Sequence, residues 1–473
     1  MPGQHVQRTK TALAYGAMIA AAVAVFGLIR HAGQDLVAPD APTLAAPRVG
    51  MSNAAGDALL HILLALVVVI VLARIVGALF KFLNQPAVIG EVLAGILLGP
   101  SLLGRVAPDV SAYVLPPTVA PFLGVLSQVG VILYMFVVGL ELDTRLLRQR
   151  THTTVAISHA SIVAPFLLGA TLALWLYPQL SSSNVPFTVF ALFMGVSMSV
   201  TAFPVLARIL TDRRMHKSRL GTIALACAAV DDVTAWCLLA FIVGVVHAQP
   251  GSILLTLGLT AGYIVAVLTL VRPLVWHLVR WHARQKKLSQ GTLALVCVAL
   301  LLSALTTEWI GIHALFGAFL LGACVPHDSA LARDLLEKLE DVVVVLLLPA
   351  FFAFTGMRTQ IGLVSGLEQW LVCATIIFVA SLGKFGGTAV AARLTGLDWL
   401  QASSLGILMN TRGLMELIVL NIGLDLGVLS PTLFAMFVIM ALVTTLATTP
   451  VLHALTLREA TRESVWSGEA AKS

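Results

Sequence analysis

Residues Leu220–Val246 read LGTIALACAAVDDVTAWCLLAFIVGVV, an apolar stretch with two adjacent carboxylates at its centre. The stretch exceeds the ~20 residues that a helix needs to cross a bilayer. At about 1.5 Å per residue, Asp231 and Asp232 lie roughly 20 Å from Arg219 at its basic end. An ionised Asp at that depth costs about 2.5–3.5 kcal/mol. One Asp could make a structural hydrogen bond, but the pair favours a site that binds and releases a cation.

The composition of the whole chain agrees with a membrane location. Of its 473 residues, 59% are hydrophobic and 11% are charged, against about 25% charged in soluble domains. The sequence therefore predicts an all-α polytopic membrane protein. Neither GxxxxGK[ST] nor GxGxxG occurs between a strand and a helix, so we expect no nucleotide and no cofactor. The five cysteines lie in apolar runs without CxxC, which favours packing over a metal site. We expect a transporter, not an enzyme.

Hydropathy divides the chain into fourteen apolar segments. The first, residues 11–29, predicts a signal-anchor helix, with a cleaved signal peptide as the alternative. A linker follows up to residue 56. The other thirteen segments are expected at 57–82, 85–104, 118–140, 152–178, 186–210, 220–247, 251–275, 290–307, 310–326, 337–357, 367–392, 402–424 and 430–455.

The basic residues predict how these segments are oriented. If the N-terminus and every second loop are cytoplasmic, 23 of the 29 Lys and Arg residues lie inside and four outside. Such a bias is the positive-inside signature of membrane proteins. We therefore expect both termini in the cytoplasm, in a bacterial cytoplasmic membrane. The net charge of +6 then reflects topology, and we expect no nucleic-acid partner.

Without the N-terminal segment, the thirteen helices divide as six, one and six, with the two sixes in opposite orientation. This arrangement predicts an inverted-repeat transporter with its site near mid-membrane. The expected parts are an anchor and linker (1–56), a first repeat (57–247), a connecting helix and basic loop (248–289), a second repeat (290–456) and a tail (457–473).

The fifth segment of each repeat carries helix-breaking residues in mid-span. Polar residues, Pro and Gly loosen a membrane helix, and freed backbone groups can then face a cavity. We therefore predict two broken helices that meet at the site, although a simple kink in each is the alternative. The residues expected to support the breaks are Ser199, Pro204, Asn410, Arg412 and Glu416.

The acidic pair suggests how the site works. Adjacent helical residues point about 100° apart, so one carboxylate can face the gap between the broken helices. Burial disfavours the charged form of a carboxylate, so the site can hold a proton or a monovalent cation but not both. Such competition at Asp231 and Asp232, with alternating exposure to the two sides, suffices for cation/proton exchange.

Two basic residues also lie inside apolar segments. For Lys384 we predict an ion pair with Asp231, the alternative being snorkelling to the membrane surface. Arg412 and Glu416 are four residues apart and thus share a helical face. They are expected to support the site by offsetting the dipoles of the half-helices, with a self-neutralising pair as the plainer interpretation.

Two further carboxylates lie nearer the cytoplasmic ends of their segments. Glu91 is about one and a half turns into its segment, and Glu141 ends the next one. Both are possible parts of an ion path. A structural role for Glu91 and a solvated helix end for Glu141 are the alternatives.

Six stretches together resemble the second monovalent cation:proton antiporter family. They are QPAVIGEVLAGILLGPSLLG (from Gln85), FVVGLELD (from Phe136), SVTAFPVLARIL (from Ser199), VDDVTAW (from Val230), GIHALFGAFLLG (from Gly311) and MNTRGLMELIVLNIG (from Met409). Within the family, the chain is most similar to the plant cation/proton exchangers (CHX), the NapA-like sodium/proton antiporters and the Kef branch. The resemblance covers residues 57–455.

This resemblance implies a homodimer in which a core domain slides against a dimerisation domain. It also implies that Asp232 binds the ion, that Asp231 and Lys384 are its partners, and that Thr201 is the polar residue of the first broken helix. The N-terminal segment, residues 11–29, is not part of the helix pattern of this family. Only 17 residues follow Thr456, so gating by a nucleotide is not expected. The substrate is Na⁺ or K⁺, exchanged for H⁺, with a channel-like pathway or a carrier of organic solutes as alternatives.

Overall fold

The computed structural model describes residues 2–39, 55–142, 152–215, 218–247, 253–285 and 288–470. Within these ranges every regular element is helical. Twelve helices are long and apolar enough to cross a membrane, and one bent pair brings the number to thirteen. The short apolar helix α15 corresponds to the remaining predicted segment, residues 310–326. The chain is thus a multi-pass integral membrane protein. Most of the predicted 30–56 linker lies outside the described residues.

Two sets of helices pack tightly within themselves. We call the first the core group: α8 (His152–Leu180), α9 (Phe187–Ser199), α10 (Phe203–Asp212), α11 (Arg219–His247), α18 (Gly366–Ser381), α19 (Gly387–Leu394), α20 (Trp399–Met409), α21 (Leu414–Asp425) and α22 (Pro431–Ala470). We call the second the flanking group: α2 (Ala55–Phe82), α3 (Ala87–Leu98), α6 (Ala120–Glu141), α14 (Gln290–Ile310), α15 (Ala314–Cys324), α16 (Ala330–Val342) and α17 (Leu348–Arg358).

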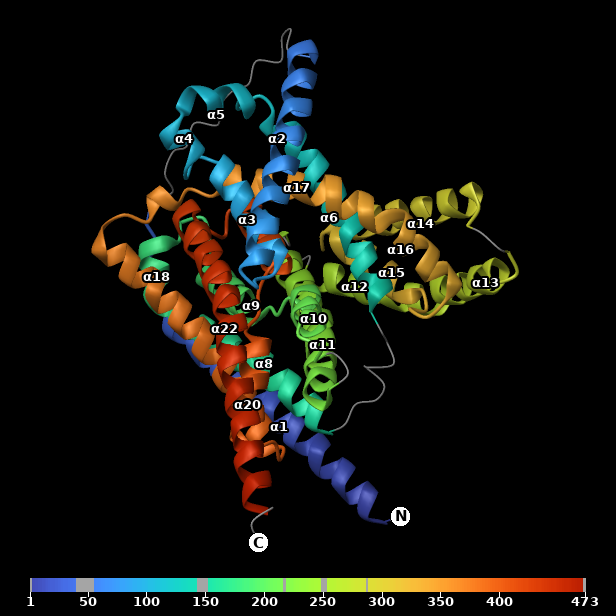
Figure 1. Cartoon of the computed structure of the whole chain (residues 1–473), viewed down its shortest axis with the longest axis vertical. Helices are drawn as coiled ribbons and strands as arrows, with labels where there is room; N and C mark the ends of the chain where they lie inside the picture. Colours follow the sequence, from blue (N-terminus) through green and yellow to red (C-terminus); the bar gives the residue numbers. More distant parts are fainter. Residues whose placement is uncertain are drawn as a thin grey trace.

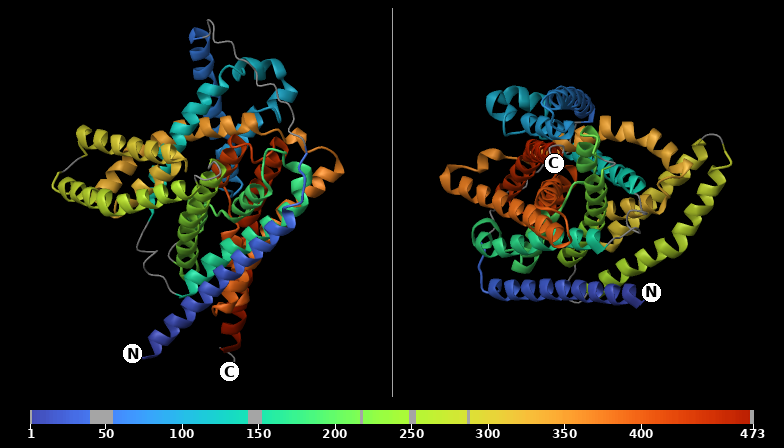
Figure 2. Two further views of the ribbon diagram at one scale, coloured as in Figure 1. Left: turned by 180° about the vertical axis from the view of Figure 1, so that it is seen from behind. Right: turned by 60° about the horizontal axis from the view of Figure 1, so that its bottom comes forward.

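The other elements join or cover these groups. Helix α1 (Pro2–Gly33) packs against α8 and α9 and runs obliquely along the core group (Figure 2). Helices α4 (Leu103–Val106) and α5 (Pro108–Val114) follow α3. Helix α12 (Ile253–Ala266) contacts both α11 and α14, so it connects the groups. Helix α1 begins and α22 ends at the same end of the molecule (Figure 1).

The connecting helix is longer than the sequence indicates. The sequence predicts that this helix ends at residue 275 and that a basic loop follows, but α12 continues through the π-helical turn η1 (Val267–Val271) into α13 (Arg272–His282). Helix α13 is amphipathic, so charged residues do not end it. Arg280 is exposed, whereas His282 is buried and contacts Asp334 at 2.8 Å. Arg280 also lies 6.0 Å from the ring centroid of Trp276. Helix α13 therefore extends seven residues into the predicted loop.

Both predicted helix breaks are present, and they touch. Helix α9 ends at Ser199 before the extended residues 200–202, and α10 starts with Pro204 in its first turn, where a missing N–H is tolerated. In the second repeat α20 and α21 are bent by 46° around residues 410–413. The N–H of Ala202 donates to the carbonyl of Thr411 at 3.0 Å. A Cβ on Gly413 would lie only 2.7 Å from Val205, so this close crossing requires glycine.

Candidate functional site

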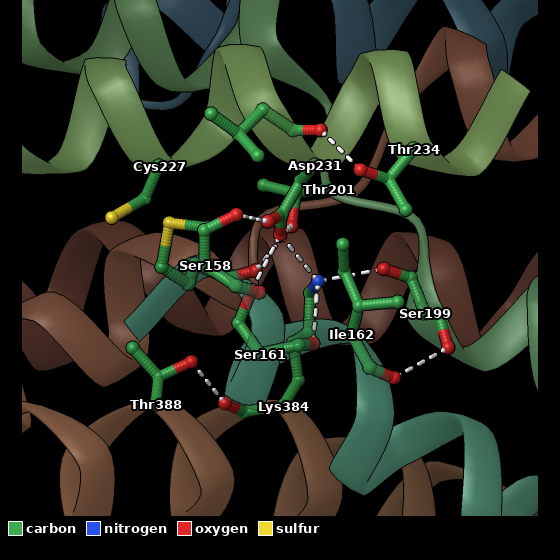
Figure 3. Close-up of polar contacts among 12 residues, drawn as sticks. Ser158, Ser161, Ile162, Ser199, Thr201, Cys227, Asp231, Thr234, Lys384 and Thr388 are labelled. Carbon is green, nitrogen blue, oxygen red and sulfur yellow. Dashed lines mark hydrogen bonds and ion pairs between the residues drawn. The ribbon is translucent and has the colours of Figure 1, made fainter. Parts of the chain in front are cut away.

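The carboxylate of Asp231 is completely enclosed and fully hydrogen-bonded. Ser158 of α8 donates to Oδ1 at 2.8 Å, and Ser161 of α8 donates to Oδ2 at 2.6 Å. Thr201, in the first break, donates to Oδ2 at 3.0 Å. Figure 3 shows these hydroxyl groups converging on the side chain from different elements. With the lysine described next, the carboxylate has four hydrogen-bond donors. They stabilise its negative charge although Asp231 is 0% exposed.

Lys384 supplies the fourth donor to Asp231. Its Nζ lies 2.9 Å from Asp231 Oδ2, and both side chains are 0% exposed. The ion pair that the sequence predicts is therefore present, and snorkelling to the surface is not. Nζ also donates to the carbonyls of Ser199 at 2.6 Å and Ser161 at 2.9 Å (Figure 3). Lys384 lies in the π-helical turn η4 (Leu382–Gly386) between α18 and α19.

Asp232 is buried beside this pair but is held differently. Its side chain is 2% exposed, and Oδ1 has no hydrogen-bond partner among the residues that the structure describes. The backbone N–H of Phe203, in the first turn of α10, is the donor that faces it. A helix N-terminus favours a nearby negative charge. Asp232 therefore keeps a carboxylate oxygen available, whereas Asp231 does not.

Arg412 and Glu416 form a second buried ion pair. Arg412 Nη1 lies 2.8 Å from Glu416 Oε2, and both residues are 0% exposed. The guanidinium also donates to the carbonyls of Ser197 and Met198, each at 2.7 Å. Together with Lys384 on Ser199, it satisfies the free carbonyls at the C-terminus of α9. Glu416 lies in the first turn of α21. Each charge thus faces the favourable end of a half-helix, as expected from the sequence.

Two residues predicted for the ion path lie apart from this cluster. Glu91 is on α3 and packs against Gly77 of α2, within the flanking group. Glu141 is at the end of α6 and has Glu340 as a charged neighbour. Within the described ranges, no hydrogen bond joins Glu91 or Glu141 to the Asp231–Lys384 cluster.

Some residues at the site were missed from the sequence. Ser158 and Ser161 are three residues apart on α8, so they share a helical face. Their only signal was this spacing of hydroxyl groups in an apolar segment. Tyr134 of α6, 9% exposed, has both Asp232 and Glu141 as neighbours. Tyr134 is thus a residue of the flanking group that lies near the site. No sequence pattern distinguishes it from an ordinary packing residue.

Comparisons with known proteins cover most of the chain. A profile of the family described as "Sodium/hydrogen exchanger, transmembrane" matches residues 64–457. The chain is 47% identical to the Na⁺/H⁺ antiporter NhaS4 of Synechocystis sp. over 397 residues, covering 83% of this chain and 97% of the relative. It is 38% identical to cation/H⁺ antiporter 17 of Arabidopsis thaliana and 33% identical to K⁺/H⁺ antiporter 1 of Saccharomyces cerevisiae. These matches cover 85% and 81% of this chain, but 49% and 45% of those proteins.

A solved structure shares the fold. The sodium proton antiporter MjNhaP1 from Methanocaldococcus jannaschii superposes with a TM-score of 0.62 and 16% identity, covering 84% of this chain and 97% of that one. With two crossing broken helices in oppositely oriented halves, the chain has the inverted-repeat fold expected from the sequence. Helix α1 lies outside the residues that the family profile matches.

Proposed function

Because the chain belongs to the transmembrane sodium/hydrogen exchanger family, we propose that it is a secondary antiporter that exchanges a monovalent cation, Na⁺ or K⁺, for protons. The observation that carries this proposal is the contrast at the paired carboxylates. Asp231 is neutralised by Lys384, whereas Asp232 is buried with a free oxygen atom. Asp232 is therefore the group that exchanges its occupant, and Asp231, Thr201 and Lys384 hold the surroundings in place.

The exchange follows from the cost of burying charge. An isolated carboxylate in a poorly hydrated site is stabilised either by a proton or by a bound cation. When a cation enters, the proton leaves Asp232, and when a proton returns, the cation is released. The same group then carries the two ions in opposite directions. The buried side-chain oxygen of Asn410, in the second break, also lacks a partner and is a further candidate ligand.

Transport also requires that the site open to each side in turn. The core group carries Asp231, Asp232 and Lys384, and the flanking group packs beside it. Between the groups lies a cavity of about 370 Å³ that includes Gln128 of α6 and Asn421 of α21. We propose that the core group slides against the flanking group, and that the flanking group forms the homodimer contact.

The buried state of the site argues against the alternatives. Asp231 and Lys384 are 0% exposed and Asp232 is 2% exposed, which suits occlusion of an ion better than a conducting pore. A carrier of organic solutes needs a roomier site with fewer acidic groups. We place the protein in the bacterial cytoplasmic membrane with both termini in the cytoplasm, as the basic residues indicate, and we assign it no enzymatic activity.

The test is ion flux through the purified protein in liposomes. With an imposed pH gradient and a pH-sensitive dye, addition of Na⁺ or K⁺ should dissipate the gradient, at a rate that saturates with cation concentration. Choline chloride is the control, because this large organic cation does not fit a site for a bare alkali ion. A gradient that no alkali cation dissipates would contradict antiport, and cation flux without proton movement would indicate a channel.

A further inference from the structure

A cavity of about 630 Å³ lies where the turn between α2 and α3 meets α10 and α22. Its basic lining residues are Lys81, Arg213 and His453. The turn is shaped by Asn84, which has the left-handed backbone angle φ of 56° that Asn tolerates. The cavity therefore contains residues of both the flanking group and the core group, at the end of the molecule where basic residues gather.

The charges in this cavity favour an anion. Arg213 contacts His453 Nδ1 at 3.2 Å and donates to the Thr449 carbonyl at 3.5 Å, which fixes its guanidinium at the wall. Lys81 has no ion pair or hydrogen bond within the described part of the chain. Asp212 also lines the cavity, but its carboxylate pairs with Arg208 at 3.2 Å. The two uncompensated positive charges would repel Na⁺ or K⁺, so this cavity is unsuited to the cation path.

We propose that this cavity binds a phosphate group, carried by an anionic phospholipid or as free phosphate. Lys81 and Arg213 supply the charge-assisted contacts that phosphate oxygens favour. Because Lys81 and Arg213 belong to different groups, the bound phosphate joins them and slows their relative movement.

Native mass spectrometry of the full-length protein in detergent tests the lipid source. Phosphatidylglycerol should remain bound to the wild type, and the neutral phosphatidylcholine should not. Lys81→Gln with Arg213→Gln should weaken retention at least about tenfold. Arg333→Gln with Lys338→Gln, two exposed residues of α16 outside the cavity, should retain the lipid like the wild type.

Inorganic phosphate and glycerol phosphate test the soluble source. If free phosphate is the ligand, either compound should raise the melting temperature of the wild type but not of the Lys81/Arg213 double variant. The melting temperatures without ligand verify that each variant is folded. If neither the lipid nor the soluble phosphates distinguish the wild type from the double variant, the proposal is wrong. It is also wrong if the α16 control loses binding equally. These readouts are independent of ion exchange.

Discussion

The two buried ion pairs have similar lengths but different surroundings. Lys384–Asp231 joins residues 153 positions apart, and three hydroxyl groups also donate to the carboxylate. Arg412–Glu416 spans four positions across one helix break, and Oε1 of Glu416 has no partner. Lysine can lose its proton in a buried site, whereas arginine cannot. One pair can therefore change its charge next to Asp232, while the other is a fixed support.

The surroundings of each ion pair also explain why its charges can be buried. Burying two charges is costly unless further hydrogen bonds satisfy them. The Arg412 guanidinium makes those bonds with the carbonyls at the end of α9. The hydroxyl of Thr445 in α22 holds the Arg412 backbone, because it accepts from the Arg412 N–H and donates to the Arg412 carbonyl. The arginine thereby fixes the position of the second break against both α9 and α22.

The largest effect is expected at the carboxylate that belongs to neither pair. Asp232→Asn should reduce cation-dependent proton flux in liposomes to the level of empty vesicles, because the amide cannot exchange a proton for a cation. The melting temperature should remain near that of the wild type, since no basic partner is lost. Asp341→Asn, at an exposed position of α16, is the matched control. Normal coupled flux in Asp232→Asn would refute the assignment of the site.

Competition at Asp232 should also appear as a pH dependence. A proton must leave before the cation binds, so lower pH should raise the cation concentration needed for half-maximal flux. The rise should approach about tenfold per pH unit where the proton dominates. The test is cation flux into the liposomes, measured at several pH values with the same pH on both sides of the membrane. An unchanged half-saturating concentration, with only the maximal rate altered, would contradict competition at one group.

Removal of the two cations should distinguish the pairs by stability. Arg412→Ala leaves Glu416 and two backbone carbonyls without their donor, and should cost about 3–5 kcal/mol. Lys384→Ala likewise leaves the carbonyls of Ser161 and Ser199 without this donor, but Asp231 keeps three hydroxyl donors, so the loss should be smaller, about 2–3 kcal/mol. In thermal denaturation in detergent, the melting temperature of Arg412→Ala should therefore be lower than that of Lys384→Ala. The reverse order would mean that the hydroxyl groups contribute little to holding Asp231.

The smallest effect concerns those hydroxyl groups directly. Ser161→Ala should destabilise the protein by about 1.5–3 kcal/mol, because a hydrogen bond to a charged group is lost. Ser404→Ala is the matched control, since the Ser404 hydroxyl is equally buried but has no partner. It should be neutral or slightly stabilising. Equal losses in the two variants would indicate a packing effect, not support of Asp231.

The parts of the site that could be predicted are those where charge or helix breakers stand out against an apolar background. Asp231, Asp232 and Lys384 are recognisable because a charge in a membrane segment is costly and requires a partner. The breaks were predictable from Pro204 and the polar cluster at Asn410. The assignment of Asp232 as the ion-binding residue came from resemblance, because the sequence makes the two aspartates equivalent.

Other features depend on tertiary packing and leave no local pattern. Ser158, Ser161 and Tyr134 become neighbours of the aspartates only when α6, α8 and α11 are packed. Hydropathy also placed the end of the connecting helix too early, since an amphipathic surface helix such as α13 continues with charged residues. The grouping of helices could not be derived from residue spacing either.

The position of α1 has a practical consequence. This helix rests on α8 and α9, whereas α2, the next helix along the chain, belongs to the flanking group. If the core group slides during transport, a fluorescent label on α1 would travel with the transported ion, and a label on α2 would stay behind. The energy transfer between the two labels would then report each turnover from within a single polypeptide, without any change near the aspartates.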